Sequence, residues 1–245
     1  MCTATWLFND NGYDLFFNRD ELNTRKEAIP PILKSIYSIS YLSPTDADEG
    51  GTWIAVNQFG LSLFLLNYYH ADFNIKQEIK YKSRGLIIPD LINGDNPGLV
   101  FAKLSESDLS YFRPFILAVI SSEKKVSTFS WNGAEKTINE NVDVPLCSSS
   151  FKSVDVIKSR SEYFRSEVKS TISLTVDTYF AFHKSHYPDK NAFSVCMHRD
   201  DAHTVSLCHV KVTRNEISLS YLSGNPCEGY FSPPIFLDRV KTELS

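Results

Sequence analysis

The sequence predicts an α+β fold in which antiparallel sheets and helices are layered in one domain. Hydrophobic segments of strand length, separated by turn residues, occur near both ends of the chain, and helical patterns lie between them. The chain has 245 residues, of which 42% are hydrophobic and 22% are charged, so a sizeable core is available. No composition shift marks a linker and no repeat is evident. We therefore expect residues 1–245 to form a single domain.

The first third of the chain predicts two hairpins joined by a long loop. Alternating apolar residues at 3–8 and 13–19 flank the turn sequence Asn9-Asp10-Asn11-Gly12. Residues 21–50 are polar and contain Pro30-Pro31, which indicates a loop, and strands at 52–57 and 61–67 follow. The strand at 61–67 is apolar on both sides, as expected for a sheet that is covered on both faces.

The rest of the chain predicts helices between further strands. Helical spacing occurs at 84–93, 99–104, 154–171 and 175–183, with apolar positions of the third helix at Val154, Ile157, Phe164 and Val168. Strand patterns occur at 114–121, 125–131, 194–198, 204–212 and 216–222.

Charge and hydropathy exclude several functions. The net charge of −4 and the absence of a basic strip argue against nucleic acid as a partner. The longest apolar stretches, 61–66 and 115–120, are too short to span a membrane, and the first residues have no basic lead, so we expect no secretory signal. Five cysteines form an odd set without a CxxC pair, which indicates a reducing compartment. We expect a cytoplasmic protein.

Other candidate sites favour structural roles. His183 and His186 lie three apart on a predicted helix, and His198, His203 and His209 fall near Cys196 and Cys208. No pair has the spacing of a zinc finger with a matching second pair, so no metal is expected. No GxSxG pattern surrounds Ser148-Ser149-Ser150. Gly50-Gly51 lacks the Lys-Ser/Thr of a phosphate loop and instead predicts a sharp turn into the next strand.

Cys2 is the strongest candidate for a catalytic residue. Methionine is commonly removed before a small second residue, and its loss would place a thiol and a free α-amine on one Cα. An α-amine titrates near neutral pH and can accept and return a proton. Cys2 would then carry both a nucleophile and its base.

Three further residues are candidates for the same site. Pairing of the first two strands brings Arg19 beside Cys2, where it would favour the thiolate, and Asp20 could orient the α-ammonium. Because neighbouring strand residues face opposite sides, both can serve the thiol only if the strand ends or bulges at Asn18-Arg19. An amide N–H of Asn67 aimed at an oxyanion would contribute about 3 to 4 kcal/mol.

Four motifs in this order resemble the NRDE family, the family of the transport and Golgi organisation protein 2. They are Met1-Cys2, Asn18-Arg19-Asp20-Glu21, Gly50-Gly51-Thr52-Trp53 and Leu66-Asn67-Tyr68, with Arg84-Gly85 as a weaker match. That family in turn resembles the N-terminal-nucleophile hydrolases of the penicillin V acylase, bile salt hydrolase and acyl-coenzyme A:6-aminopenicillanic acid acyltransferase branch.

The resemblance implies a four-layer αββα sandwich of antiparallel sheets and a set of site residues. By position, Cys2 would be the nucleophile, Asp20 the partner of its α-amine, Arg19 the neighbour of the thiol and Asn67 an oxyanion donor. Two departures stand out. The acylases separate the Arg and the Asp by two residues, and their second Asn has only Ser149 as a possible counterpart here.

The resulting hypothesis is a cysteine amidohydrolase that cleaves a linear, non-peptide C–N amide bond of a small molecule without a cofactor. If an amine accepts the acyl group, the same site is an acyltransferase. The alternative is a non-catalytic protein for secretory organisation or for lipid or haem handling on the same scaffold, which the Ser149 departure favours. Pocket residues are expected in the loops 21–50 and 68–83, and Asn18 and Trp53 are possible substrate contacts, although Trp53 is favoured as a core residue.

Overall fold

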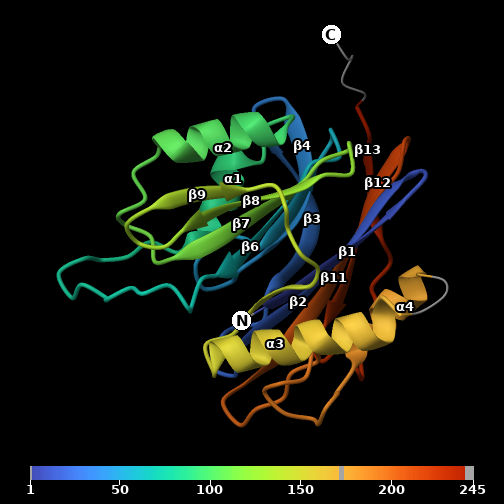
Figure 1. Ribbon diagram of the computed structural model, residues 1–245. Coiled ribbons are helices and arrows are strands. Elements are labelled where there is room, and N and C mark those ends of the chain that lie inside the picture. Colours follow the sequence, from blue (N-terminus) through green and yellow to red (C-terminus); the bar gives the residue numbers. More distant parts are fainter. Residues whose placement is uncertain (1, 171–173, 241–245) are drawn as a thin grey trace.

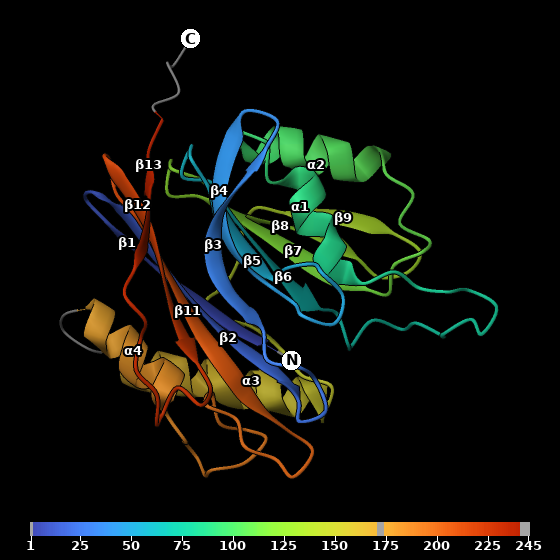
Figure 2. The same cartoon turned by 180° about the vertical axis from the view of Figure 1, so that it is seen from behind.

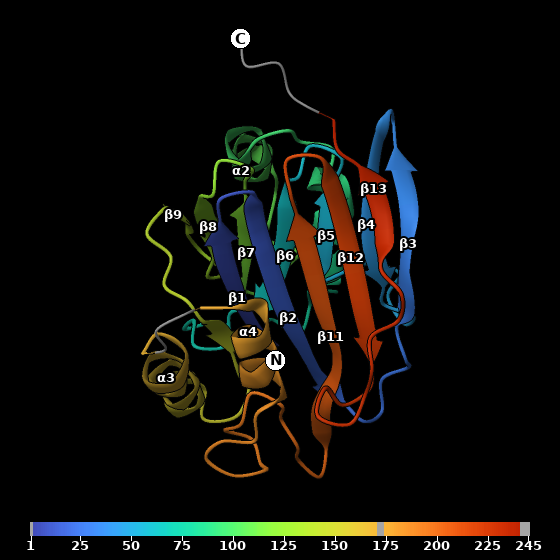
Figure 3. The same cartoon turned by 90° about the vertical axis from the view of Figure 1, so that its right-hand side faces the viewer.

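Two antiparallel sheets packed face to face form the centre of the computed structural model, which describes residues 2–170 and 174–240 (Figure 1). Figure 3 looks onto the first sheet, whose strand order is β10-β1-β2-β11-β12-β13. Its strands are β1 (Cys2–Asn9), β2 (Gly12–Leu22), β10 (Leu146–Ser148), β11 (Ala202–Val212), β12 (Glu216–Ser223) and β13 (Ile235–Asp238). The second sheet runs in chain order through β3 (Ile29–Ile36), β4 (Ile39–Thr45), β5 (Ile54–Asn57), β6 (Ser62–Asn67), β7 (Phe115–Ile120), β8 (Val126–Trp131) and β9 (Lys136–Asn139).

Helices cover the outer face of each sheet. A 3-10 turn (Arg84–Leu86), α1 (Ile87–Leu91) and α2 (Pro97–Glu106) lie on the second sheet, as Figure 2 shows from behind. On the first sheet lie α3 (Ser153–Tyr163), its π-helical continuation (Phe164–Val168) and α4 (Val176–Lys184). The predicted αββα sandwich is therefore confirmed. Within 2–170 and 174–240, no helix has both the length and the apolar character needed to cross a membrane.

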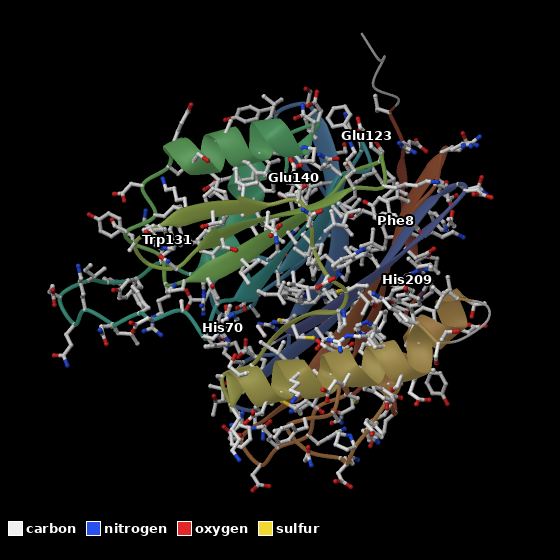
Figure 4. All side chains as sticks on the ribbon, in the orientation of Figure 1. Phe8, His70, Glu123, Trp131, Glu140 and His209 are labelled. Carbon is white, nitrogen blue, oxygen red and sulfur yellow. The ribbon has the colours of Figure 1, made fainter. Side chains whose placement is uncertain are left out.

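Three apolar clusters hold the four layers together, and side chains fill the space between the ribbons (Figure 4). Strand β6 shows how one sequence serves two of them. Phe64 and Leu66 pack between the sheets, whereas Leu63 and Leu65 pack toward the helices α1 and α2. This alternation confirms that the arm at 61–67 belongs to a sheet covered on both faces.

The region 21–50, predicted as a loop, contains the hairpin of β3 and β4. The strand was not predicted because prolines are typical of loops. Pro30 and Pro31 lie in β3, which is the edge strand of its sheet, and the pairing with β4 is irregular between Ile29 and Ile32. An edge strand with a bulge tolerates residues that cannot donate a backbone hydrogen bond.

The strand predicted at 194–198 is also wrong, because the chain bends at 194–196 and forms only an isolated bridge from His198 to His203. The Ser194 hydroxyl contacts the carbonyls of Asn191 and Cys196 at 2.8 and 2.7 Å, and such local bonds compete with a sheet. The remaining predicted helices and strands are present, but the short strands β9, β10 and β13 had not been foreseen. Thr171 lies outside the described residues.

Buried hydrogen bonds fasten α4 to β2. The Asn18 amide donates to the carbonyls of His183 and Val195 at 2.9 and 3.0 Å, so its oxygen must accept from His183 Nδ1, 3.0 Å away. His183 Nε2 then accepts from the Thr5 hydroxyl at 2.7 Å. This arrangement fits a neutral imidazole, and burial, reinforced by Arg160, lowers the pKa of His183 to about 3.

This histidine predicts an acid-sensitive fold. Because its folded pKa lies below its unfolded value of about 6.5, the unfolded chain binds more protons between these values, and stability falls as the pH drops below about 6.5. Between pH 7 and pH 5, wild type should lose about 2 kcal/mol more unfolding free energy than His183→Gln, measured by urea denaturation. Equal losses in both proteins would contradict the assignment.

Candidate active site

Cys2 borders a cavity of about 600 Å³. Residues from both sheets and from the surrounding loops line this cavity. In the antiparallel register, Cys2 is opposite Arg19 of β2 on one side and Ser148 of β10 on the other. Paired residues of this kind share a face of the sheet. The hairpin predicted from the sequence thus brings Arg19 to the thiol. Only 9% of Cys2 is exposed, so the cavity leads to a largely desolvated sulfur.

Arg19 is fixed between an acid and an aromatic ring. Its Nη2 is 2.6 Å from Asp46 Oδ2, and its guanidinium carbon is 4.3 Å from the centre of the Trp53 ring. Although burial acts to raise the pKa of Asp46, Arg19 and Arg25 hold that pKa below its usual value. Asp46, which the sequence analysis had left in a loop, therefore positions the cation beside Cys2.

The Cys2 thiol is held in a neutral state by its surroundings. Burial raises the pKa of Cys2 and the charge of Asp20 adds to this effect, whereas the positive charge of the N-terminus, Arg19 and a backbone hydrogen bond with Asp20 act in the opposite direction. Since the net shift is upward, the protonated thiol predominates at neutral pH. Nucleophilic attack from this position requires a base that removes the thiol proton.

Asp20 faces the opposite side of the sheet from Arg19. Its carboxylate is 3.2 Å from Arg160 of α3 and accepts a hydrogen bond from the Thr204 hydroxyl at 2.7 Å. Strand β2 neither ends nor bulges at Asn18-Arg19 but continues to Leu22; the bulge is in β11, between Thr204 and Ser206. Asp20 borders the cavity, yet these two partners of its carboxylate lie beneath the sheet.

Arg160 is a buried partner that the sequence analysis missed. Its side chain is fully buried, and it also donates to Thr3 Oγ1 at 2.7 Å. The signal was present in the spacing: Val156, Arg160 and Phe164 occur every four residues and are all buried, so a charge stands on the inner face of a helix. Val154, which had been assigned to that face, is 69% exposed.

Asn67 reaches the same cavity from the end of β6. Its amide nitrogen donates to the Tyr69 hydroxyl at 2.6 Å. Arg84 lines the cavity too, donates to the carbonyl of Pro114 at 3.0 Å, and has a pKa that burial lowers. The irregular segment 68–83, seen as the teal excursion in Figures 1 and 2, supplies further lining residues.

Two serines lie at the end of β10: Ser148 is its last residue, and Ser149, the serine suggested by the resemblance, follows it. Ser149 bonds to the backbone of Phe151 through its hydroxyl and is not among the residues that line the cavity. Ser148 does not line the cavity either, but it is the residue opposite Cys2, and its hydroxyl is buried without a hydrogen-bond partner among the described residues. Ser148 is therefore better placed than Ser149 to act beside the thiol.

Asn18 and Trp53, the two residues suggested as substrate contacts, differ in their position relative to the cavity. Asn18 faces the helix layer and is fully buried, so it anchors α4 and does not reach the cavity. Trp53 both packs in the core between the sheets and lines the cavity. Trp53 is therefore both a core residue and part of the pocket wall.

Two glycines bring the cavity walls together. A Cβ on Gly51 would lie 2.4 Å from the carbonyl carbon of Gly85, closer than side chains and backbone can approach. The backbones touch here, and Thr52 N donates to the Gly85 carbonyl at 2.9 Å. Gly50, with φ of +73°, makes the predicted sharp turn just before this crossing.

The comparison with protein-family models finds Transport and Golgi organisation 2 over residues 1–224. The chain belongs to this family. The match confirms the family suggested by the four motifs. The comparison with curated protein sequences gives no match.

Solved structures of amide hydrolases share the fold. The N-acylethanolamine-hydrolyzing acid amidase ortholog of Caenorhabditis elegans aligns with 85% of this chain and 92% of its own, with a TM-score of 0.60 and 13% identity. Penicillin V acylase from Agrobacterium tumefaciens aligns over 97% and 86%, with a TM-score of 0.55 and 9% identity. Conjugated bile acid hydrolase from Clostridium perfringens, as its C2A mutant, aligns over 100% and 99%, with a TM-score of 0.54 and 9% identity.

The buried ion pair beneath the site predicts a large loss of stability in Arg160→Met. The substitution removes one member of a buried ion pair whose side chains are both fully buried, which should cost about 3 to 5 kcal/mol. The matched control is Lys158→Met on the same helix, whose side chain is 71% exposed and should change stability by less than about 0.5 kcal/mol. Chemical denaturation measures both, and equal effects would contradict a structural role for the pair.

Proposed function

We propose that the protein is an N-terminal-nucleophile hydrolase that cleaves a linear, non-peptide C–N amide bond, with Cys2 as nucleophile after removal of Met1. The state of Met1 lies outside the described residues. The observation that carries the proposal is the position of Cys2, which borders a large cavity together with Arg19 and Asn67. The shared fold of three amide hydrolases supports the reaction class.

In the proposed reaction, the α-amine of Cys2 takes the thiol proton while the sulfur attacks the amide carbonyl carbon. This base is needed because burial favours the neutral thiol, and an α-amine titrates at about 7.7 to 8. The carbonyl oxygen becomes an oxyanion, the C–N bond then breaks, and the leaving amine receives the proton from the α-ammonium. Water hydrolyses the remaining thioester and releases a carboxylic acid and free Cys2.

The surrounding residues act on charge and orientation in this mechanism. Arg19, held by Asp46 and Trp53, favours the developing thiolate. Asp20 orients the α-ammonium from a position fixed by Arg160 and Thr204. Asn67 donates to the oxyanion, and Ser148 replaces Ser149 as the proposed second donor because its hydroxyl has no partner among the described residues.

The substrate in this proposal is a small acylated amine, and an amine in place of water makes the same site an acyltransferase. The proposed location is the cytoplasm, as all five cysteines are free thiols. The binding alternative also has a specific observation in its favour, because no asparagine stands at Ser148 or Ser149.

The decisive variant is Cys2→Ala. Assayed with a panel of N-acyl amines and N-acyl amino acids, wild type should release the acid and Cys2→Ala should lose at least about 10⁴-fold in kcat/KM. Cys147→Ala is the matched control: Cys147 is also buried next to β1 but pairs with Thr3, whose side chain lies on the other face. It should retain activity. Equal turnover by Cys2→Ala would remove Cys2 from the mechanism, and binding by both proteins without turnover would favour the non-catalytic alternative.

Asn67→Ala tests the oxyanion donor. Loss of one donor should lower kcat by about 10²- to 10³-fold with little change in KM, because the interaction forms only in the transition state. Tyr69→Phe, which removes the present partner of Asn67 without removing the donor, should affect kcat far less. Steady-state kinetics compare the two variants. Equal effects would indicate that Asn67 acts through the loop and not on the substrate.

A further inference from the structure

A second cluster of reactive side chains lies outside the proposed active site, in the connections that precede β11 and follow β12. His186, Cys196, His198 and Cys227 each offer one ligand atom, and these four atoms all lie within 4.8 Å of one another. They come from three separate segments: the exit of α4, the turns before β11 and the turn after β12. In Figure 3, the connection from α4 to β11 and the connection from β12 to β13 lie at the same end of the first sheet.

Two of the distances between these atoms match those in a tetrahedral zinc site. With Zn–S of about 2.3 Å and Zn–N of about 2.0 to 2.1 Å, tetrahedral geometry places sulfur and nitrogen about 3.6 Å apart. The Nε2 of His198 lies 3.6 Å from Sγ of Cys196 and 3.6 Å from Sγ of Cys227. A ring nitrogen of neutral imidazole has either one lone pair or one N–H, so a single linear hydrogen bond explains only one of these two contacts, whereas a shared metal ion explains both.

The remaining histidine also lacks a partner. His186 Nε2 is buried and has no hydrogen bond within the described part of the chain, although its ring lies 5.0 Å from the His198 ring. A buried polar atom without a partner is costly unless a ligand satisfies it. Cys196 is fully buried, whereas the other three residues are partly exposed, so the cluster is accessible to an ion from solvent.

We propose that His186, Cys196, His198 and Cys227 bind one Zn²⁺ ion in a closed, structural site. Two neutral imidazoles and two thiolates suit zinc, and they leave the filled site without net charge. Binding displaces one proton from each thiol to solvent, so affinity increases with pH. This proposal departs from the sequence expectation that no metal is bound; the spacing had been compared only with that of zinc fingers, and Cys227 is far from the others in sequence.

The site would hold in place the loop that supports the active-site edge. The segment between His186 and Thr204 supplies the carbonyls of Ala192 and Phe193 to Arg160, both at 3.4 Å. Its Met197 N–H donates to the Thr204 hydroxyl, which in turn donates to Asp20. Zinc would therefore stabilise the buried group beneath β2, but its presence does not depend on any activity of Cys2.

The test is metal content of the full chain, purified under reducing conditions without a metal-affinity tag and then incubated with Zn²⁺ and dialysed. Elemental analysis should find about one zinc per chain in wild type and less than about 0.1 in His186→Ala and in Cys227→Ser. His186→Cys, which keeps four ligands, should retain zinc. The controls Cys208→Ala and His203→Gln, outside the cluster, should retain it as well. Thermal unfolding of wild type should shift upward with zinc, and that of Cys227→Ser should not.

Cobalt binding to wild type gives a readout that does not require a stable variant. Co²⁺ in a tetrahedral site with thiolates produces intense visible bands, which zinc then abolishes. Wild type without zinc and without these bands would overturn the proposal, as would zinc retained by both His186→Ala and Cys227→Ser. A disulfide between Cys196 and Cys227 that persists in the reduced, zinc-treated protein would also overturn it. None of these results depends on amide hydrolysis, so they leave the test of the Cys2 mechanism separate.

Discussion

Strand β2 is fixed by antiparallel partners on both sides, and this register determines which residues reach the cavity and which reach the helices. Arg19 shares a face with Cys2 and points to the space between the sheets, while Asn18 and Asp20 point to the layer formed by α3 and α4. A slip of one residue would exchange the two sets. The motif Asn18-Arg19-Asp20 is thus a single strand segment with contacts on both faces: a cation beside Cys2 on one, and anchors for the helix layer on the other.

The helix layer in turn supports the site from beneath. Arg160 joins α3 to Asp20, to Thr3 of β1 and to the turn before β11, so four parts of the chain meet at one buried guanidinium. His183 and Asn18 make a second buried joint nearby. The proposed zinc site lies at the far end of the same turn segment. Because buried polar groups are stable only when all partners are in place, these contacts make the strand edge that carries Cys2 rigid.

The sequence allowed much of this arrangement to be predicted, but only where the signal was local. The first hairpin, the two-sided pattern of β6 and the position of Asn67 at a strand end all follow from residues close together in the chain. Strand β3 was missed because prolines at a sheet edge look like a loop. Asp46, Arg160 and the cluster around Cys227 depend on contacts between distant segments, which no local pattern encodes. The choice between Ser148 and Ser149 needed the register of a three-residue strand.

Every step proposed for Cys2 requires a free α-amine on that residue. The most direct measurement is the intact mass of the full-length protein expressed without an N-terminal tag, followed by peptide sequencing of its N-terminus. The account predicts a chain that is lighter by one methionine residue and begins with Cys2. A chain that retains Met1 in full would keep the nitrogen of Cys2 in a peptide bond, and this result would contradict the proposed mechanism.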